Sequence, residues 1–365
     1  MDYLGRQQRL REALPAERMD ALLVAHLPNI RYLCGFSGSA GALAVSAGGC
    51  ALFTDGRYTV QAKAEVQAAK VIVVRKAPLR AAVEWLGRKV QSNRTRTSQR
   101  VGFEGQYLTV AARRALSDGL PRHVRLREAP PLVERARMVK DADEIQAIRS
   151  AAAQGATLFD RALQVIRPGV REVEVAAEME YAARKAGADA MSFETIIASG
   201  VRSALPHGRA SDASIASGGF VVCDFGVILH GYCSDRTRTV YVGTATGEAR
   251  RVYEAVLTSQ QAAIEAVRPG AKVSRVDGAA RKTLQQNGLG QYFTHSTGHG
   301  VGLEIHEAPR VAQGQQEILQ PGMVITIEPG VYLPGQWGVR IEDMVVVTDQ
   351  GCEVLAPTQK DFIVI

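Results

Sequence analysis

Three of the seven histidines of this 365-residue chain lie within twelve residues, in the stretch HSTGHGVGLEIH from His295 to His306. The middle one, His299, lies between two glycines. Neutral imidazole is the commonest metal ligand among side chains, and neighbouring glycines let the backbone approach an ion or a substrate closely. This clustering predicts a metal or substrate site in the carboxy-terminal part of the chain.

Four carboxylates interrupt segments that otherwise have the composition of buried strands. Asp224 lies in FVVCDFG and Asp235 in CSDRTRTVYV, while Glu328 lies in MVITIEPG and Glu342 in GVRIEDMVVV. Such apolar runs are typical of strands covered on both faces, so the acids are predicted to be buried. Burial of an ionised carboxylate costs several kcal/mol unless a cation compensates it. The alternative, four surface acids on amphipathic strands, requires an alternation that these runs lack.

Two aspartates, two glutamates and one histidine form an oxygen-rich set of ligands with four negative charges, which two divalent cations would balance. Manganese or cobalt suits this set best, and iron or zinc stays open. Two metal ions ~3.5 to 4 Å apart can share a water, bring its pKa towards ~7 and stabilise the charge that develops in hydrolysis. The residue types therefore predict a dinuclear hydrolase.

The segment that carries these residues repeats one pattern. A predicted helix ends at RPG (167–169) and a second at KAG (185–187), and the same order returns at RPG (268–270) and QNG (286–288), 101 residues later in both cases. Asp141 and Glu144 form a capping box that predicts the start of the first helix. We expect two copies of a helix-helix-strand unit, related by a pseudo-twofold axis, with the site in a shared cleft.

Residues 1–133 alternate helical and strand patterns and predict a small α/β domain with a parallel or mixed sheet. Helices are expected near 3–14, 57–69, 78–91 and 107–117, and strands near 21–25, 42–46, 50–54, 71–74 and 101–104. Prolines and charges in APPLVERARMVKD (129–141) break the alternation. The predicted domains are therefore 1–133 and 134–365.

Composition narrows the class of protein. The chain has 44 Lys and Arg against 37 Asp and Glu, and residues 1–133 hold 21 of the former and 10 of the latter. These basic residues are scattered without aromatic interleaving, which favours a solvated surface over a nucleic-acid site. No apolar run reaches the length of a membrane span. Five cysteines without paired short spacing favour a reducing environment, so a cytoplasmic protein without membrane partners is expected.

The motifs GHGVGLEIHE, TIEPGVY, VRIEDMVVV and VCDFG followed by SDRTRT resemble those of the pita-bread metallopeptidases, which include methionine aminopeptidase, proline dipeptidase and aminopeptidase P. The resemblance covers about residues 134–365 and implies the pita-bread fold there. IRYLCGFSGSAG and LFTDGRY resemble the smaller creatinase/prolidase-like amino-terminal domain of the proline-directed members. Methionine aminopeptidases generally lack that domain, so the resemblance points to the proline-directed branch.

The resemblance implies a role for each of the five ligands. Asp224 chelates one metal ion, Asp235 and Glu342 bridge the two ions, and His299 and Glu328 complete the other. Glu328 also carries a proton from the attacking water.

Four further residues match substrate-facing positions of the family. His306 is expected to bind the scissile carbonyl oxygen as charge develops on it, and His207 to lie near the leaving nitrogen. His295 and Arg340 match residues of the proline-directed members that line the subsite or anchor a carboxylate. Arg340 has the alternative role of orienting a ligand carboxylate.

The first hypothesis is an exopeptidase that removes the amino-terminal residue from peptides beginning Xaa-Pro, as aminopeptidase P does. A proline dipeptidase, with the same chemistry in a pocket closed to longer peptides, is the nearest alternative. A non-catalytic relative that binds peptides or a protein is disfavoured because all five ligand positions are filled. The expected partner is a proline-containing peptide, and the resemblance also implies a homodimer.

Overall fold

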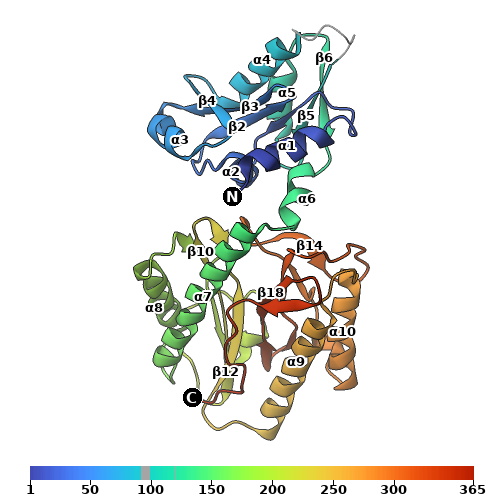
Figure 1. The fold of residues 1–365 in the computed structure, drawn as a ribbon. Helices are drawn as coiled ribbons and strands as arrows, with labels where there is room; N and C mark the ends of the chain where they lie inside the picture. Colours follow the sequence, from blue (N-terminus) through green and yellow to red (C-terminus); the bar gives the residue numbers. More distant parts are fainter. Residues whose placement is uncertain (92–98, 119) are drawn as a thin grey trace. The chain divides into compact units, whose positions relative to one another are not determined.

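The computed structural model describes residues 1–91, 99–118 and 120–365. The chain folds as two compact units, Met1–Arg137 and Met138–Ile365 (Figure 1). The boundary predicted between residues 133 and 134 falls inside helix α6 (Leu132–Met138), and the two units divide near the end of that helix.

The first unit is built on a mixed sheet of six strands in the order β4-β3-β2-β1-β5-β6. Strands β3 and β4, β1 and β5, and β5 and β6 pair in parallel, whereas β1, β2 and β3 pair antiparallel. The α/β prediction for this part of the chain is confirmed. The elements are α1 (Tyr3–Ala13), β1 (Ala21–Val24), α2 (Leu27–Cys34), β2 (Gly41–Ser46), β3 (Gly49–Asp55), η1 (Gly56–Tyr58), α3 (Thr59–Glu65), β4 (Ala69–Val74), α4 (Pro78–Gln91), β5 (Gln99–Glu104), α5 (Val110–Asp118) and β6 (Val124–Ala129).

Helix α2 and strand β6 were not predicted from the sequence. The backbone that leads into α2 is held by Glu104 of β5, whose Oε2 accepts hydrogen bonds from the N–H groups of Ala25 (2.7 Å) and His26 (2.8 Å). This acceptor lies 79 and 78 residues further along the chain. A helix start is usually recognised from a capping side chain next to it, and α2 begins after His26 without such a cap, so it leaves no local signal.

Four helices of the second unit follow the predicted repeat. They are α7 (Ala142–Val165), α8 (Glu172–Lys185), α9 (Gly247–Ala266) and α10 (Val273–Gln286). Both ends of α8 and α10 are 101 residues apart, and so are the last residues of α7 and α9. The Asp141 side chain accepts from the Glu144 N–H at 2.9 Å and Glu144 accepts from the Asp141 N–H at 3.0 Å, which is the predicted capping box.

The strands repeat in the same way. The first half contains an antiparallel sheet β12-β9-β8, and the second half a sheet β14-β13-β15-β18-β19 in which β15 and β18 pair antiparallel as β9 and β12 do. The duplicated helix-helix-strand prediction is confirmed. These elements are β7 (Ala190–Met191), β8 (Ile196–Ser199), η2 (Gly200–Ala204), β9 (Gly219–Phe225), β10 (Val227–Leu229), β11 (Tyr232–Cys233), β12 (Arg236–Val242), η3 (Gly290–Tyr292), β13 (Gly298–Gly300), β14 (Glu307–Val311), β15 (Val324–Ile327), β16 (Gly330–Leu333), β17 (Trp337–Arg340), β18 (Asp343–Val347) and β19 (Cys352–Val354).

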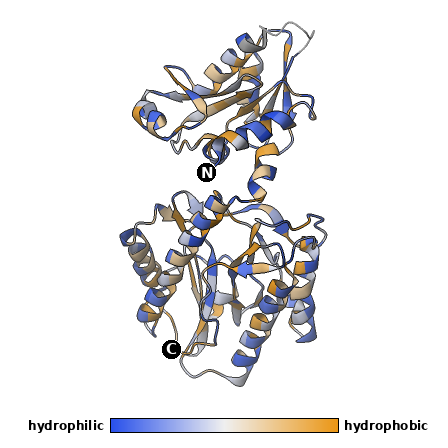
Figure 2. Ribbon diagram, viewed as in Figure 1, coloured by the Kyte–Doolittle hydropathy of each residue, from blue (hydrophilic) through white to orange (hydrophobic). Residues whose placement is uncertain are grey.

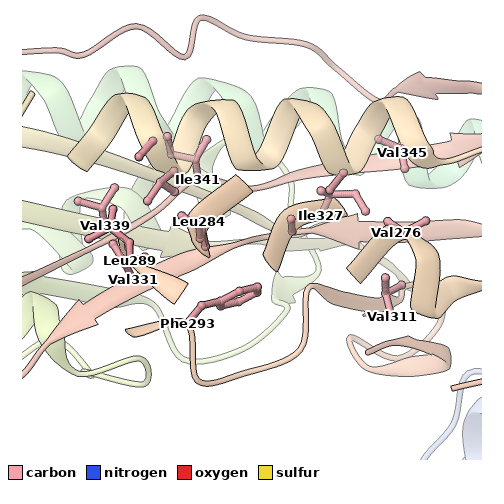
Figure 3. Packing of buried hydrophobic residues seen from close by; sticks show 14 of the residues in the cluster. Val276, Leu284, Leu289, Phe293, Val311, Ile327, Val331, Val339, Ile341 and Val345 are labelled. Atoms are coloured by element: carbon pink, nitrogen blue, oxygen red, sulfur yellow. The ribbon is translucent and has the colours of Figure 1, made fainter. Parts of the chain in front are cut away.

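Apolar packing fixes the strands of the second half. Val276 and Leu284 of α10 lie in one cluster with Ile327 of β15 and Val345 of β18, and none of these four side chains is exposed (Figure 3). Hydrophilic and hydrophobic residues alternate along the helices of this unit (Figure 2). In the part of the chain that the structure describes, no helix has the length and apolar character that crossing a bilayer requires. A densely packed core makes β15 and β18 rigid supports for side chains at their ends.

A buried ion network holds the start of β18. Arg238 of β12 is 1% exposed, binds Asp343 Oδ1 through Nη2 at 2.7 Å and donates through Nη1 to the carbonyl of Glu342 at 2.6 Å. Lys360 Nζ lies 2.8 Å from Asp343 Oδ2. Burial alone would raise the pKa of Asp343, but the charges of Arg238 and Lys360 outweigh it and hold that pKa below its ordinary value. The network thereby fixes the backbone beside Glu342.

Arg238→Met is expected to lower the free energy of unfolding by about 3 to 5 kcal/mol, because it removes one partner of a buried ion pair and leaves the other charge poorly compensated. Chemical denaturation followed by circular dichroism measures this loss. The control is Arg149→Met, since the Arg149–Glu353 pair is 33% and 53% exposed, and a loss below about 1 kcal/mol is expected there. Equal losses in the two variants would contradict a structural role for the buried network.

Candidate metal centre

One cavity of about 780 Å³ in the second unit is lined by every residue singled out from the sequence. The first half of the repeat contributes His207, Asp224 and Asp235, and the second half contributes His295, His299, His306, Glu328, Arg340 and Glu342. Side chains up to 135 residues apart in the sequence thus face one space, at the junction of the two halves.

The four acids occupy matching places in the two halves. Asp224 lies in β9, where it pairs with Thr237 of β12, and Asp235 immediately precedes β12. Glu328 immediately follows β15, and Glu342 immediately precedes β18. Asp235 and Glu342 are 6% and 1% exposed, so the alternative of surface acids is wrong for both. Paired antiparallel strands in each half therefore bring two carboxylates to the cavity.

The hydrogen bonds of His299 define its tautomer. Its Nδ1 lies 3.0 Å from the Gly300 carbonyl oxygen, which only accepts, so Nδ1 carries the proton. Nε2 then offers a lone pair, and it faces Glu328 Oε1 at 3.4 Å and Asp235 Oδ2 at 3.6 Å. Burial, followed by the charge of His306, lowers the pKa of His299 to about 4, so the ring is neutral at pH 7. A neutral nitrogen lone pair that faces two carboxylates is the arrangement of ligands around a cation.

Two buried carboxylate oxygens support the same interpretation. Glu342 Oε2 accepts from the Thr237 hydroxyl at 2.7 Å, and Asp224 Oδ2 accepts from Arg340 Nη2 at 2.5 Å. The second oxygen of each group, Glu342 Oε1 and Asp224 Oδ1, is buried and has no hydrogen-bond partner among the described residues. Buried acceptors without a donor are rare in folded proteins. Asp235, His299 and Glu342 each place one ligand atom within 4.8 Å of the others, so the donor set fits a divalent cation.

The charges of the acids reinforce one another. Burial, followed by the negative charges of Glu342, Asp224 and Glu328, raises the pKa of Asp235 well above its ordinary value. Burial raises the pKa of Glu328 to about 8, with Asp224 adding to the shift and Arg340 opposing it. Protein cations alone therefore leave this cluster under-compensated, and a bound metal ion would supply the missing positive charge.

Arg340 is committed to the protein itself. It is 3% exposed, and its guanidinium donates to Asp224, to the Thr237 hydroxyl (3.1 Å), to the Pro206 carbonyl (3.1 Å) and to the Tyr332 hydroxyl (2.6 Å). Of the two roles considered from the sequence, these contacts favour orientation of the Asp224 carboxylate over binding of a substrate carboxylate.

His295 is also satisfied within the protein. Its Nδ1 lies 2.8 Å from the Ser296 carbonyl and therefore carries the proton, while Nε2 lies 3.0 Å from the Tyr332 hydroxyl. Because Arg340 donates to Tyr332, the Tyr332 hydroxyl donates to His295 Nε2. Burial lowers the pKa of His295 to about 4, so a neutral ring forms part of the cavity wall. Tyr332 was not singled out from the sequence.

His207 and His306 are more accessible. The His306 ring meets the His299 ring edge to face with centroids 4.3 Å apart, and burial followed by the charge of His207 lowers the pKa of His306. His207 is exposed on the segment that follows η2. Both rings therefore lie at the cavity with nitrogens available to a ligand.

Arg310 also lines the cavity and was missed by the sequence analysis. It pairs directly across the β-ladder with His299, and directly opposite residues of an antiparallel pair project from the same face. Arg310 is exposed and forms no hydrogen bond or ion pair with any described residue. By contrast, Arg209 in the same cavity lies 3.0 Å from Glu194. Because His306 precedes β14 (Glu307–Val311), strand alternation does not link it to Arg310, and the sequence held no local signal for this residue.

Comparison with known protein families agrees with this site. Residues 146–349 match the model of metallopeptidase family M24, and residues 6–139 match the creatinase/prolidase N-terminal domain. The chain therefore belongs to metallopeptidase family M24 and is a metal-dependent hydrolase with the two-domain, pita-bread architecture expected from its motifs.

Three Xaa-Pro peptidases are similar to this chain in sequence or in structure. A structure of Xaa-Pro dipeptidase from Bacillus anthracis superposes with a TM-score of 0.93 and 37% identity over the whole of both chains. A structure of X-Pro aminopeptidase from Thermotoga maritima gives a TM-score of 0.88 and 35% identity over 99% of this chain and 100% of the other. Xaa-Pro dipeptidase of Pyrococcus furiosus is 47% identical over 227 residues, which is 62% of this chain and 65% of that protein.

Proposed function

We propose that this metallopeptidase is an Xaa-Pro dipeptidase, which hydrolyses the bond before proline in dipeptides. The observation that carries the proposal is Arg310, an unpaired guanidinium in the cavity that is suited to the free carboxylate of a dipeptide. The similar dipeptidases of Bacillus anthracis and Pyrococcus furiosus support it. This choice reverses the order of preference taken from the sequence, which favoured an aminopeptidase.

Asp224, Asp235, His299, Glu328 and Glu342 are the residues that we propose to hold two divalent ions, with manganese as the first candidate. Carboxylate oxygens and one imidazole nitrogen are ligands that suit divalent ions such as manganese. When bound, such ions supply positive charge that polarises the scissile carbonyl and lowers the pKa of the attacking water.

The protein's own groups then move protons and stabilise charge. Glu328, a carboxylate that lines the cavity beside His299 Nε2, is suited to take a proton from the attacking water and return it later. A neutral His306 offers one N–H to the carbonyl oxygen as negative charge develops. His207 is proposed to contact the leaving nitrogen.

A proline after the scissile bond places two demands on the enzyme. The bond before proline is a tertiary amide without an N–H, so the enzyme must recognise the ring by its shape. The nitrogen leaves as a secondary amine and needs a proton. The neutral His295 ring and the apolar wall residues Phe193, Ile196 and Ile305 provide a surface against which such a ring can pack.

Arg310→Met is expected to raise KM for an Xaa-Pro dipeptide by about 10- to 100-fold with a small change in kcat, because it removes a charge-assisted hydrogen bond worth about 1.5 to 3 kcal/mol. The control is Arg209→Met, whose ion pair with Glu194 is exposed. Steady-state kinetics with both variants measures the difference. A loss confined to kcat, or equal effects at the two positions, would contradict carboxylate binding by Arg310.

Substrate length separates the two candidate functions. An Xaa-Pro dipeptidase cleaves Xaa-Pro and leaves Xaa-Pro-Yaa-Zaa intact, whereas an aminopeptidase cleaves the longer peptide. The similarity to the X-Pro aminopeptidase of Thermotoga maritima keeps the second function as the alternative. Turnover of the tetrapeptide at a rate equal to that of the dipeptide would sink the dipeptidase proposal. The homodimer and the cytoplasmic location stay predictions.

A further inference from the structure

Glu172 is a fully buried carboxylate outside the metal-binding cluster. It is the first residue of α8, is 0% exposed and does not line the cavity. Its Oε1 accepts from the Ser199 N–H (2.8 Å) and hydroxyl (2.9 Å), and its Oε2 accepts from Arg202 Nε (3.0 Å) and from the Ser211 N–H (3.1 Å) and hydroxyl (2.7 Å). Five donors therefore converge on one carboxylate.

These donors bracket a single segment of the chain. Ser199 is the last residue of β8, Ser211 lies twelve residues later, and the segment between them carries Pro206 and His207 into the cavity. Arg202 also ties the segment to itself, since its Nη2 donates to the Arg209 carbonyl at 2.7 Å. Glu172 thus binds both ends of the segment, and we call this set of contacts the clamp.

The His207 side chain is not held by a hydrogen bond of its own in the described part of the chain. Among the residues that the structure describes, none forms a hydrogen bond with the His207 imidazole, which is exposed. Apart from the contacts with Glu172, the segment is held by the Arg209 N–H on the His207 carbonyl (2.9 Å), by Arg340 Nη1 on the Pro206 carbonyl (3.1 Å) and by the Gly338 N–H on the Ser203 hydroxyl (2.8 Å). The placement of the ring therefore depends on how firmly the 200–210 segment is held.

The second half of the repeat contains a similar arrangement. Asp277 of α10 is 1% exposed and accepts from the Thr297 N–H (3.2 Å) and hydroxyl (2.8 Å). Arg281 binds Asp277 through Nε at 2.7 Å and donates through Nη2 to the His295 carbonyl at 2.6 Å. In each half, a buried acid on the second helix holds a hydroxyl residue and an arginine beside a cavity histidine.

We infer that Glu172 is a positioning residue for turnover, which sets the place of His207 by clamping the ends of the 200–210 segment. The inference rests on the proposed function, in which His207 contacts the leaving nitrogen. A displacement of about 1 Å in a reacting group costs on the order of 100-fold in rate. Loss of the clamp should therefore lower kcat more than it raises KM.

The matched pair of variants is Glu172→Gln and Glu174→Gln. Glu174 lies on the same helix, but its side chain is 49% exposed and accepts from the neighbouring Arg171 N–H. In the manganese-loaded full chain, we expect Glu172→Gln to speed amide hydrogen exchange in residues 200–210 by at least about ten-fold. Glu174→Gln should leave that exchange unchanged. Equal exchange in the two variants would overturn the clamp.

Kinetics then tests the link to His207. Glu172→Gln should lower kcat by about 10- to 100-fold with KM within about three-fold of the wild type. The double variant Glu172→Gln/His207→Ala should be no slower than His207→Ala alone, because a ring that is absent cannot be misplaced. Losses that multiply would overturn the inference, since they would show that Glu172 acts without His207.

The two proposals fail separately. If the wild-type enzyme does not cleave Xaa-Pro dipeptides, the proposed function falls, and the exchange measurement still decides whether Glu172 clamps the segment. If Glu172→Gln does not fold, Ser199→Ala and Ser211→Ala each remove one hydroxyl donor, and each should raise exchange in the segment by a smaller factor. Unchanged exchange in both serine variants would overturn the clamp.

Discussion

Glu328→Gln is expected to lower kcat by about 10²- to 10⁴-fold, the contribution typical of a general acid–base group, with KM changed by less than about three-fold. The carboxyl lies 3.4 Å from His299 Nε2 and accepts from the Thr326 hydroxyl at 3.1 Å. Glutamine keeps the shape and one oxygen acceptor but cannot carry the proton.

The matched control for this variant is Glu194→Gln. Glu194 lines the same cavity, yet its side chain is 59% exposed and pairs with Arg209. We expect its kcat to stay within about three-fold of the wild type. Metal content is measured in parallel by plasma emission, so that loss of an ion is separated from loss of proton transfer. Intact turnover in a metal-loaded Glu328→Gln protein would overturn the proposed role.

Asp235→Asn is expected to change stability in opposite directions with and without metal. In the metal-free protein, burial and three neighbouring carboxylates raise the pKa of Asp235 well above its ordinary value, so its charged form opposes folding at pH 7. An uncharged asparagine removes that cost, and we expect the metal-free variant to be more stable than the wild type.

With manganese bound, the wild type is expected to be more stable than Asp235→Asn. A ligand at 100 times its Kd stabilises the wild type by about 2.7 kcal/mol, and loss of a predicted bridging carboxylate should weaken affinity by more than about 100-fold. Thermal unfolding with chelator and with a manganese series measures both effects. Asp212→Asn, at a side chain that is 85% exposed, is the control and should match the wild type. A variant that loses stability without metal and keeps the manganese response would contradict the site.

The stability of the metal-free protein is expected to depend on pH because of the same carboxyl group. A carboxyl whose pKa is higher in the folded than in the unfolded state binds more protons when folded, so stability falls as pH rises above about 4, the ordinary value of aspartate. The loss continues through the raised pKa of Asp235. Asp235→Asn should flatten this decline.

The sequence predicted those site residues that stand out against the residues next to them in the chain. An acid in a run such as VVCDF is conspicuous because buried strands exclude uncompensated charge, and the glycines around His299 mark a close approach of the backbone. The repeat could be recognised because RPG and the ends of the following helices recur 101 residues later. In the structure, α10 begins and ends 101 residues after α8. For these reasons the fold and the acids at the cavity could be predicted.

Other parts of the site left no local signal. Arg310 reaches the cavity through its pairing with His299, and the choice of Arg340 for Asp224 rather than for substrate depends on contacts across 116 residues. The sequence marked Arg340 as a carboxylate anchor, whereas among the described residues that line the cavity the guanidinium without a hydrogen bond or ion pair is that of Arg310. Glu172 resembled an ordinary acid in the first turn of a helix.

Residue types and spacing alone thus predicted the duplicated architecture, the acids and histidines that line the cavity, and metal-dependent hydrolysis, because desolvation of charge and helix periodicity act on neighbouring residues of the chain. Only the tertiary structure decided which cations are already neutralised and which remain available, and which acid holds the segment of His207. The reason is physical: hydrogen bonds and ion pairs form between groups that folding brings within about 3 Å, and chain separation places no limit on such pairs.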